Sequence, residues 1–415
     1  MIRRSLIILF IAVMFVFAGC TKKEEAKGSE TANKPTSSSV SISNSDSNSK
    51  DTLKIGGILS LTGLFERAGQ SIKEGLNLYL EQHNNMLGNM KVEIKIEDDE
   101  ANPQTALRKY RQLVTGDKVD LLIGPNNSNV LNVLIDEVAK DKKLLVIPNA
   151  ALNAASWEKK NDYAYRMSYS NWQSGTAAAS YIAKNIGNKA IAIGSDYPAA
   201  HEAIDAFKKG FENSGGKVLK EIYPKLGTND YATFINDIEQ RKPDVIFMFL
   251  IDPDAIRFLK QFSEFGLKGK IQVTATEFVG EPDFINAAGD PAEGVVVPLN
   301  YSYLFDNAVN NKFVEDFRKK YNKSPNVFAV FGYDTGEAIN KAIEKAGSVK
   351  TEDLIKVMKG ITLDSPRGQI TIDPKTNNPI QNYHIARIVK KDNKIVPEFL
   401  DKVDKLTMPE KDPGK

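Results

Sequence analysis

The sequence predicts an α/β protein made of two doubly wound lobes, each with a mostly parallel sheet. Three observations lead to this fold class. Short β-branched runs alternate with amphipathic helical patterns from residue 53 onward, which is typical of βαβ units. The alternation restarts after Arg166, which indicates a second series. The strands at 119–123 and 144–147 are short and mainly apolar, as expected for a sheet that is covered on both faces.

The first series begins with a strand at 53–60, and a helix follows with Ile72, Leu76 and Tyr79 on one face, at spacings of four and three. A strand at 92–96, a helix at 103–114 and a strand at 119–123 come next. A helix whose inward face carries Val130, Val133, Leu134 and Val138 then leads to the strand at 144–147.

The second series alternates in the same way. The predicted helices are 175–185, 201–213, 231–240 and 254–265, and the predicted strands are 190–194, 218–223, 244–250 and 271–274. A strand at 295–299 and helices near 313–321 and 333–345 follow. These last helices are too few for a third domain, so we expect them to complete the first lobe. Strands within 369–389 are expected to join the second lobe.

These assignments give a division of the chain into segments. We expect the first lobe to comprise 52–168 with about 300–358, and the second lobe 169–299 with about 359–403. Each lobe then has an ordinary domain size. Residues 404–415 are expected to form a flexible tail.

The first twenty residues predict a lipoprotein signal peptide. Arg3 and Arg4 precede an apolar run at 6–18, which is shorter than the roughly 20 residues that a membrane-spanning helix needs. The run ends in Phe17-Ala18-Gly19-Cys20, which looks like a bacterial lipobox. Cys20 is the only cysteine in the chain, so lipidation is its best explanation. The alternative is an ordinary signal peptide with an incidental cysteine.

The composition of the rest bounds the function. Residues 21–51 are dominated by Lys, Glu, Ser, Thr and Asn, which predicts a disordered tether to the membrane. The chain has 55 basic and 53 acidic residues, a balance that does not predict nucleic-acid binding. The common hydrolase and nucleotide-binding motifs are missing and His83, His201 and His384 are widely separated. The sequence therefore predicts neither an enzyme nor a metal or cofactor, and we expect a monomer.

Several short motifs occur in an ordered series along the chain. They are Ser60-Leu61-Thr62-Gly63 with Gly69 and Gly75, 123–128 (IGPNNS), 146–150 (VIPNA), Tyr165-Arg166, Asp196-Tyr197, Pro243-Asp244, Ala288-Gly289-Asp290 with Glu293-Gly294, and Gly332-Tyr333-Asp334. Over 53–403 this series resembles the leucine/isoleucine/valine-binding type of periplasmic receptor. Asp196-Tyr197 through 225–227, and Ser365-Pro366-Arg367-Gly368, look most like a branch associated with aromatic acids.

The resemblance implies a fold and a function. The fold would be two Rossmann-like lobes joined by three hinge crossovers. The protein would be an extracytoplasmic solute-binding protein that hands a small molecule to ABC permease subunits. With the lipid anchor, it would sit on the outer face of the cell membrane or in the periplasm. A ligand sensor without transport is the alternative outside import.

The resemblance also implies binding residues. Ser128 either caps the helix that follows it or donates its hydroxyl to a ligand carboxylate. Ala150 would offer its backbone N–H, whereas Leu152 stands where relatives have Thr and provides no hydroxyl. Tyr197 matches a tyrosine of the family, and Glu277 falls where relatives place the partner of the ligand ammonium. Asn171 stands where relatives often have Asp.

Aromatic and charged side chains beside these motifs are further candidates. Phe65, Trp172 and Phe278 could enclose the ligand between rings, or simply pack in the protein. Arg67 could pair with a ligand carboxylate or remain at a solvated rim. Because Glu277 favours an amine, the sequence predicts a hydrophobic amino acid, branched-chain or aromatic, with an aromatic carboxylate as the alternative.

Overall fold

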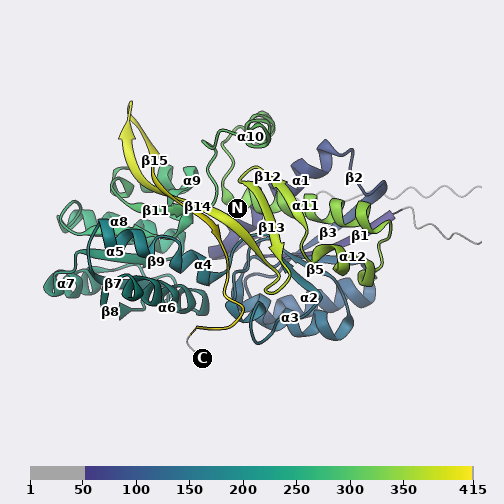
Figure 1. Ribbon diagram of the computed structural model, residues 1–415, viewed down its shortest axis with the longest axis horizontal. Coiled ribbons are helices and arrows are strands. Elements are labelled where there is room, and N and C mark those ends of the chain that lie inside the picture. Colours follow the sequence, from purple (N-terminus) through teal and green to yellow (C-terminus); the bar gives the residue numbers. More distant parts are fainter. Residues whose placement is uncertain (1–51, 414–415) are drawn as a thin grey trace, which may run out of the picture. The chain divides into compact units, whose positions relative to one another are not determined.

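The structure of the protein is a computed structural model that describes residues 52–413. The predicted signal peptide, Cys20 and the tether at 21–51 lie outside the described residues. Two sheets organise the described part of the chain, and helices cover both of them (Figure 1). Within this part, no helix combines the length and the apolar character that crossing a bilayer requires.

The first sheet has six strands in the order β2-β3-β1-β4-β5-β6, and all neighbours are parallel except β2 and β3. Its strands are β1 (Thr52–Leu59), β2 (Met86–Leu87), β3 (Met90–Asp98), β4 (Leu121–Ile123), β5 (Leu145–Ile147) and β6 (Ala164–Arg166). The connecting helices are α1 (Glu66–Gln82), α2 (Pro103–Arg111) and α3 (Ser128–Asp141). The short strands β4 and β5 are fully buried, because helices lie on both faces of the sheet.

The second sheet is built around five parallel strands in the order β8-β7-β9-β10-β11. They are β7 (Lys189–Gly194), β8 (Lys217–Ile222), β9 (Val245–Phe249), β10 (Gln272–Ala275) and β11 (Val296–Leu299). Its helices are α4 (Asn171–Thr176), α5 (Ala179–Asn185), α6 (Pro198–Asn213), α7 (Ala232–Arg241), α8 (Asp252–Glu264) and α9 (Pro282–Ala288).

The chain then returns to the first lobe and leaves it again. The returning elements are α10 (Ala308–Tyr321), α11 (Val327–Ala346), α12 (Thr351–Met358), β12 (Thr362–Ser365) and β13 (Gly368–Asp373). The long strand β14 (Asn378–Lys391) pairs with β13 at one end and antiparallel with β11 at the other (Figure 1). The strand β15 (Lys394–Leu406) pairs with β14. Three crossovers therefore join the lobes: after β6, after β11 and along β14.

Short 3-10 and π helices complete the fold: η1 (Gly63–Phe65), the π-helix η2 (Gln112–Gly116), η3 (Asn153–Ala155), η4 (Glu277–Gly280) and η5 (Asp290–Ala292). Most of the predicted strands and helices are present within a few residues of their expected bounds. Two lobes with parallel sheets and three crossovers confirm the predicted fold class. The expected helix at 175–185 is instead two helices, because α4 ends at Thr176 and α5 begins at Ala179.

Two expectations about the C-terminal part differ from the structure. The β12–β13 hairpin lies in the segment expected in the second lobe, yet its apolar side chains join Leu53 and Ile55 in the core of the first lobe. These side chains are Leu363, Ile370 and Ile372, and Ile361, directly before β12, lies in the same core. The expected tail at 404–415 is also packed in its described part. Strand β15 runs to Leu406, Met408 is 2% exposed, and the Trp157 indole donates to the Pro409 carbonyl at 2.8 Å.

Candidate functional site

A cavity lies where the loops at the carboxyl ends of both parallel sheets meet. The volume of this cavity is about 70 Å³. The lining comes from the segments after β1, β4, β5, β6, β7, β9 and β10 and from the start of α11: Leu64, Phe65, Arg67, Ala68, Asn126, Asn127, Ser128, Asn149, Ala151, Tyr169, Asn171, Tyr197, Ala199, Phe249, Ile251, Asp252, Phe278 and Phe328. Open α/β sheets bind ligands at these strand ends.

Aromatic side chains dominate the apolar part of the lining. They are Phe65, Tyr169, Tyr197, Phe249, Phe278 and Phe328. Phe65 of the first lobe meets Tyr197 of the second edge to face, with ring centroids 6.1 Å apart. The ring centroid of Tyr197 lies 6.2 Å from that of Phe249, and the ring centroid of Phe249 lies 5.4 Å from that of Phe278. Such a surface suits a small ligand with a flat apolar body.

The start of α3 provides hydrogen-bond donors toward the cavity. Asn127 is the N-cap of this helix, because its side-chain oxygen accepts from the N–H groups of Asn129 and Val130 at 2.9 and 3.3 Å. Ser128 is thus the first helical residue, and its N–H has no partner within the helix. Its hydroxyl makes no hydrogen bond to any residue within 52–413. A free hydroxyl at a helix N-terminus is well placed for an anionic group.

Two asparagines hold the neighbouring loops of the first lobe in place. The Asn126 side chain accepts from the Ser60 N–H at 2.7 Å and donates to the Phe65 carbonyl at 3.2 Å. The Asn149 amide donates to the Asn126 carbonyl at 2.9 Å, while its Oδ1 is buried without a partner in the described part of the chain. Asn149 therefore has a spare acceptor at the cavity.

Arg67 crosses from the first lobe to the second. Its Nε pairs with Asp252, at the start of α8, and its Nη1 lies 2.6 Å from Asp283 Oδ1, on α9. The guanidinium also stacks 5.0 Å from the Phe328 ring centroid. Nη2 is buried and has no hydrogen-bond partner among residues 52–413. Although burial alone would raise the pKa of Asp283, Arg67 and Asn326 together lower it. Asp252 and Asp283 are thus both occupied by the guanidinium.

Glu277 is fully buried and does not belong to the lining. Ser174 donates its hydroxyl to Glu277 Oε2 at 2.8 Å, and Oε1 has no hydrogen-bond partner among the described residues. Burial raises the pKa of the carboxyl to about 7, although the hydrogen bond from Ser174 opposes the shift. Near neutral pH, this group carries a proton in a large fraction of molecules.

The sequence has clear relatives. Residues 52–394 match the model of the periplasmic binding protein family. The chain belongs to this family. It is 30% identical over 355 residues to the Leu/Ile/Val-binding protein homolog 6 of Brucella suis biovar 1 (strain 1330), covering 83% of this chain and 89% of the relative. The members it resembles are solute-binding proteins rather than enzymes.

Two solved structures extend this similarity. One is an ABC-transporter solute-binding protein of Rhodopseudomonas palustris BisB5 in complex with 3,4-dihydroxybenzoic acid, with 32% identity, a TM-score of 0.82 and coverage of 88% of this chain and 99% of that one. Another is an R. palustris solute-binding protein in complex with benzoate, with 28% identity, a TM-score of 0.79 and coverage of 85% and 98%. This chain is a substrate-binding protein of ABC transporters, of the leucine/isoleucine/valine-binding class, and such proteins are extracytoplasmic and work with permease subunits.

This binding protein brings half of its eight predicted ligand residues into one cavity. Phe65, Ser128, Asn171 and Tyr197 line it, as do Arg67, Ile251 and Phe278. Asn171 donates to Glu202 at 2.7 Å, and burial raises the pKa of Glu202 to about 6.

The other four lie outside the lining. The Ala150 N–H donates to the Pro125 carbonyl at 3.1 Å, so it is already occupied, and Ala151 faces the cavity instead. Leu152 packs in the core of the first lobe, and its carbonyl accepts from Arg166 at 2.6 Å. Trp172 packs on Trp157 with centroids 6.2 Å apart. The fourth is Glu277.

Other lining residues were not predicted, notably Tyr169, Phe249, Asp252 and Phe328. Tyr169 follows β6, Phe249 is the last residue of β9, and Asp252 begins α8 directly after β9. The carboxyl-end rule applied to every strand could have found these three, whereas Phe328 lies in the first turn of α11, which follows a helix. Among residues 52–413, no three side chains of the metal-binding types gather in one place.

Proposed function

We propose that this protein is a lipid-anchored receptor that captures a small aromatic carboxylate between its lobes and delivers it to an ABC importer. One observation carries the choice of ligand. The cavity combines six aromatic side chains with a free hydroxyl at a helix N-terminus, and the one acidic residue in its lining, Asp252, is already paired with Arg67. The receptor function itself follows from the family.

The carboxylate would bind at the start of α3. Ser128 supplies a hydroxyl and a first-turn N–H there, and the helix dipole adds to their effect. A hydrogen bond to a charged group contributes about 1.5–3 kcal/mol. The aromatic ring would lie among Phe65, Tyr197 and Phe249, and a ring hydroxyl could donate to the spare Oδ1 of Asn149.

A hydrophobic amino acid, which the sequence favoured through Glu277, is the second candidate. An ammonium group needs an acceptor whose charge is not yet compensated. Glu277 lies behind the lining and is held by Ser174, while Asp252 already pairs with Arg67. The observation that still favours an amino acid is the similarity to Leu/Ile/Val-binding proteins. The relatives solved with benzoate and 3,4-dihydroxybenzoate support the aromatic acid.

Calorimetric titration of the purified protein separates the two candidates. We expect benzoate or 3,4-dihydroxybenzoate to bind more tightly than leucine or phenylalanine. Ser128→Ala should weaken aromatic-acid binding by about tenfold or more, since tenfold corresponds to roughly 1.4 kcal/mol. Ser214→Ala is the matched control, because its hydroxyl bonds to the Gly210 carbonyl on α6, away from the cavity.

The substitution Glu277→Gln should affect the measured affinity differently for the two candidate ligands. If an aromatic acid is the ligand, its affinity stays the same or improves when the buried carboxyl becomes neutral. Tight leucine or phenylalanine binding that this substitution weakens by about tenfold would refute the aromatic proposal and establish the amino acid.

A further inference from the structure

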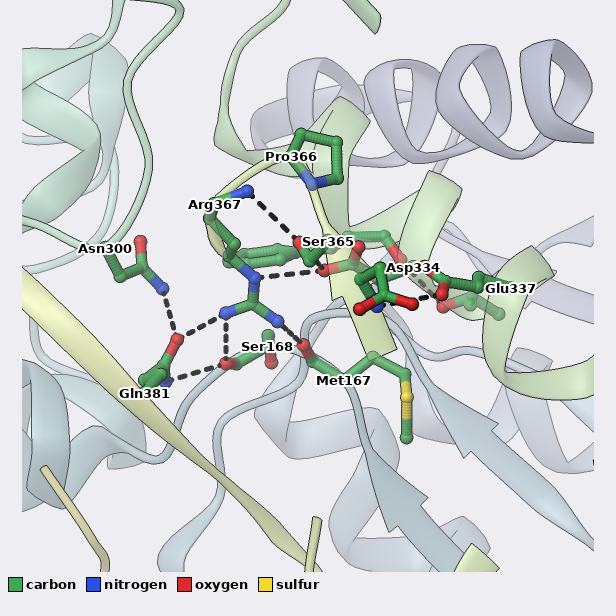
Figure 2. A network of polar contacts seen from close by, with 12 residues as sticks. Met167, Ser168, Asn300, Asp334, Glu337, Ser365, Pro366, Arg367 and Gln381 are labelled. Carbon is green, nitrogen blue, oxygen red and sulfur yellow. Dashed lines mark hydrogen bonds and ion pairs between the residues drawn. The ribbon is translucent and has the colours of Figure 1, made fainter. Parts of the chain in front are cut away.

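Arg367 is a fully buried arginine at the turn of the β12–β13 hairpin. Its side chain is 0% exposed, as is that of its ion-pair partner Asp334 on α11, which accepts from Nε at 2.9 Å. Ser365 donates to the same carboxylate at 3.0 Å. The remaining guanidinium nitrogens point away from this pair, toward the crossovers between the lobes (Figure 2).

The first crossover is bound directly. Nη2 donates to the Met167 carbonyl, and Nη1 donates to the Ser168 carbonyl at 3.1 Å. These residues directly follow β6, where the chain leaves the first lobe. The planar fork of an arginine can hold two such carbonyls at once, whereas a lysine ammonium lacks this geometry.

The other two crossovers are tied to the same guanidinium through Gln381. This residue is on β14, the third crossover, and its Oε1 accepts from Arg367 Nη1. The same oxygen accepts from the Asn300 amide at 3.1 Å, and Asn300 directly follows β11 at the second crossover. Gln381 Nε2 also donates to the Ser168 carbonyl at 2.9 Å. One buried network, shown in Figure 2, thus includes a residue of each crossover.

A line of ring contacts joins this network to the ligand cavity. Tyr169 lines the cavity, and its ring lies 5.7 Å from that of Phe331 on α11. The Arg367 guanidinium carbon lies 5.0 Å from the centroid of the same Phe331 ring. Tyr169 also follows Ser168 directly in the chain, so the cavity wall and the hinge network are joined both through the backbone and through the ring contacts.

We propose that Arg367 is the positioning residue of the hinge: it holds the three crossovers in register and, through Phe331 and Tyr169, makes lobe closure respond to an occupied cavity. This inference goes beyond the proposed function, because it holds for any small ligand. For this role, the free energy of the network must differ between the open and closed arrangements of the lobes. Both the Kd of the ligand and the distance between the lobes must therefore depend on Arg367.

The test uses the full chain with Cys20→Ala and spin labels at Lys140→Cys on α3 and Gln240→Cys on α7, one on each lobe. Double electron–electron resonance measures the distance between the labels with and without 3,4-dihydroxybenzoate, and calorimetry measures the Kd. We expect Arg367→Lys to broaden the distance distribution without the probe and to raise the Kd about tenfold. Phe331→Leu should raise the Kd while leaving the probe-free distribution as in the wild type.

Two controls separate this role from a general loss of stability. Arg257→Lys breaks a pair with the buried Asp254 within the second lobe, and Phe262→Leu removes a buried ring from the core of that lobe. Both should lower the Tm without changing the Kd or the label distances. The double variant of Phe331 and Arg367 should bind no more weakly than Arg367→Lys alone, since the two residues act in one path.

The inference is overturned if Arg367→Lys lowers only the Tm, or if the effects of the two substitutions on binding simply add. If Arg367→Lys does not fold, Gln381→Met removes the same link between crossovers and must broaden the probe-free distances. If the wild type fails to bind 3,4-dihydroxybenzoate, the proposed ligand class is wrong. The probe-free distances still decide the hinge role, because overlapping wild-type and Arg367→Lys distributions would refute it.

Discussion

At the scale of single residues, burial decides what each polar group can do. Glu277 and Ser128 both resemble ligand contacts of the family, yet one is enclosed behind the cavity wall and the other opens into it. A carboxyl without solvent is neutralised by a proton rather than offered as a charge. Ser128 keeps its hydroxyl free because Asn127 performs the capping.

The raised pKa of Glu277 predicts how stability depends on pH. The folded-state value of about 7 exceeds the ordinary value of 4.5, so the folded protein holds more protons than the unfolded chain between these values. Stability from this group is therefore complete below pH 4.5 and is lost as the pH rises through 7. We expect Glu277→Gln to remove roughly 2 kcal/mol of the decrease between pH 5.5 and 8.5.

Urea unfolding of the wild type and the variant at both pH values measures this difference. A control substitution, Glu239→Gln, changes an exposed residue on α7 and should leave the pH dependence as it is. If the wild type and Glu277→Gln lose the same free energy of unfolding between pH 5.5 and 8.5, then Glu277 titrates normally and does not occupy the buried position described.

At the scale of secondary-structure elements, the first lobe depends on close packing of α1 against α11. A Cβ atom at Gly75 would lie 1.8 Å from the Ala329 carbonyl oxygen, and one at Gly332 would lie 2.0 Å from that of Ile72. The two helices approach so closely that backbone, not side chain, meets each glycine. Because α1 carries Arg67 and α11 carries Phe328 and Phe331, this packing also fixes parts of the cavity and of the hinge.

Gly332→Ala should therefore be strongly destabilising. The backbone of α1 has to move away to admit the methyl group, and we expect a loss of about 3 kcal/mol or more in the free energy of unfolding. Gly116→Ala is the matched control, since nothing lies within 4 Å of the added Cβ. Thermal melts of both variants check the prediction, and equal Tm values for Gly332→Ala and the wild type would exclude this helix contact.

The contacts between elements of opposite lobes should govern how long a ligand stays bound. Asp283 on α9 meets both Arg67 at 2.6 Å and the Asn326 amide at 2.9 Å. Since the side chains of Arg67 and Asp283 are partly exposed, their ion pair is weaker than a buried one. We expect Asp283→Asn to raise the Kd about fivefold, mainly through faster dissociation.

Stopped-flow release of the aromatic acid measures this rate. Asp237→Asn is the control, because its partners Lys220 and Arg241 lie in the same lobe. An association rate that falls while dissociation stays constant would show that Asp283 guides ligand entry instead of holding the lobes together.

At the scale of the whole molecule, the alternation of strands and helices was enough to predict two lobes and the position of the cavity. The spacing of apolar residues indicates which segments form the strands and helices. The position of the cavity can then be predicted, because ligands bind at the carboxyl ends of parallel strands. The orientation of single side chains was less predictable. Glu277 opens the 3-10 turn η4 and Ala150 precedes η3, and such segments have no repeating pattern that separates an inward from an outward residue.

The β12–β13 hairpin was misplaced for a different reason. Its alternating apolar residues predict a strand with one buried face, but this pattern does not tell which of two cores receives that face. The sequence identifies Arg367 only as part of a motif, since its role depends on carbonyls some 200 residues away along the chain. Long-range contacts of this kind are visible only in the folded molecule.

The proposed attachment of the receptor to its membrane depends on Cys20, which lies outside the described residues. Each buried CH₂ contributes about 0.8 kcal/mol, so two or more acyl chains hold a protein durably, whereas none of the described helices could span a bilayer. We expect Cys20→Ala either to release the folded protein into the soluble fraction or to leave it as an unprocessed precursor.

Fractionation with and without detergent, together with the mass of the mature N-terminus, distinguishes these forms. A control substitution in the tether, Ser38→Ala, should keep the protein with the membrane. If Cys20→Ala is processed normally and still needs detergent for extraction, some other part of the receptor anchors it, and the lipid is not what keeps the binding protein beside its importer.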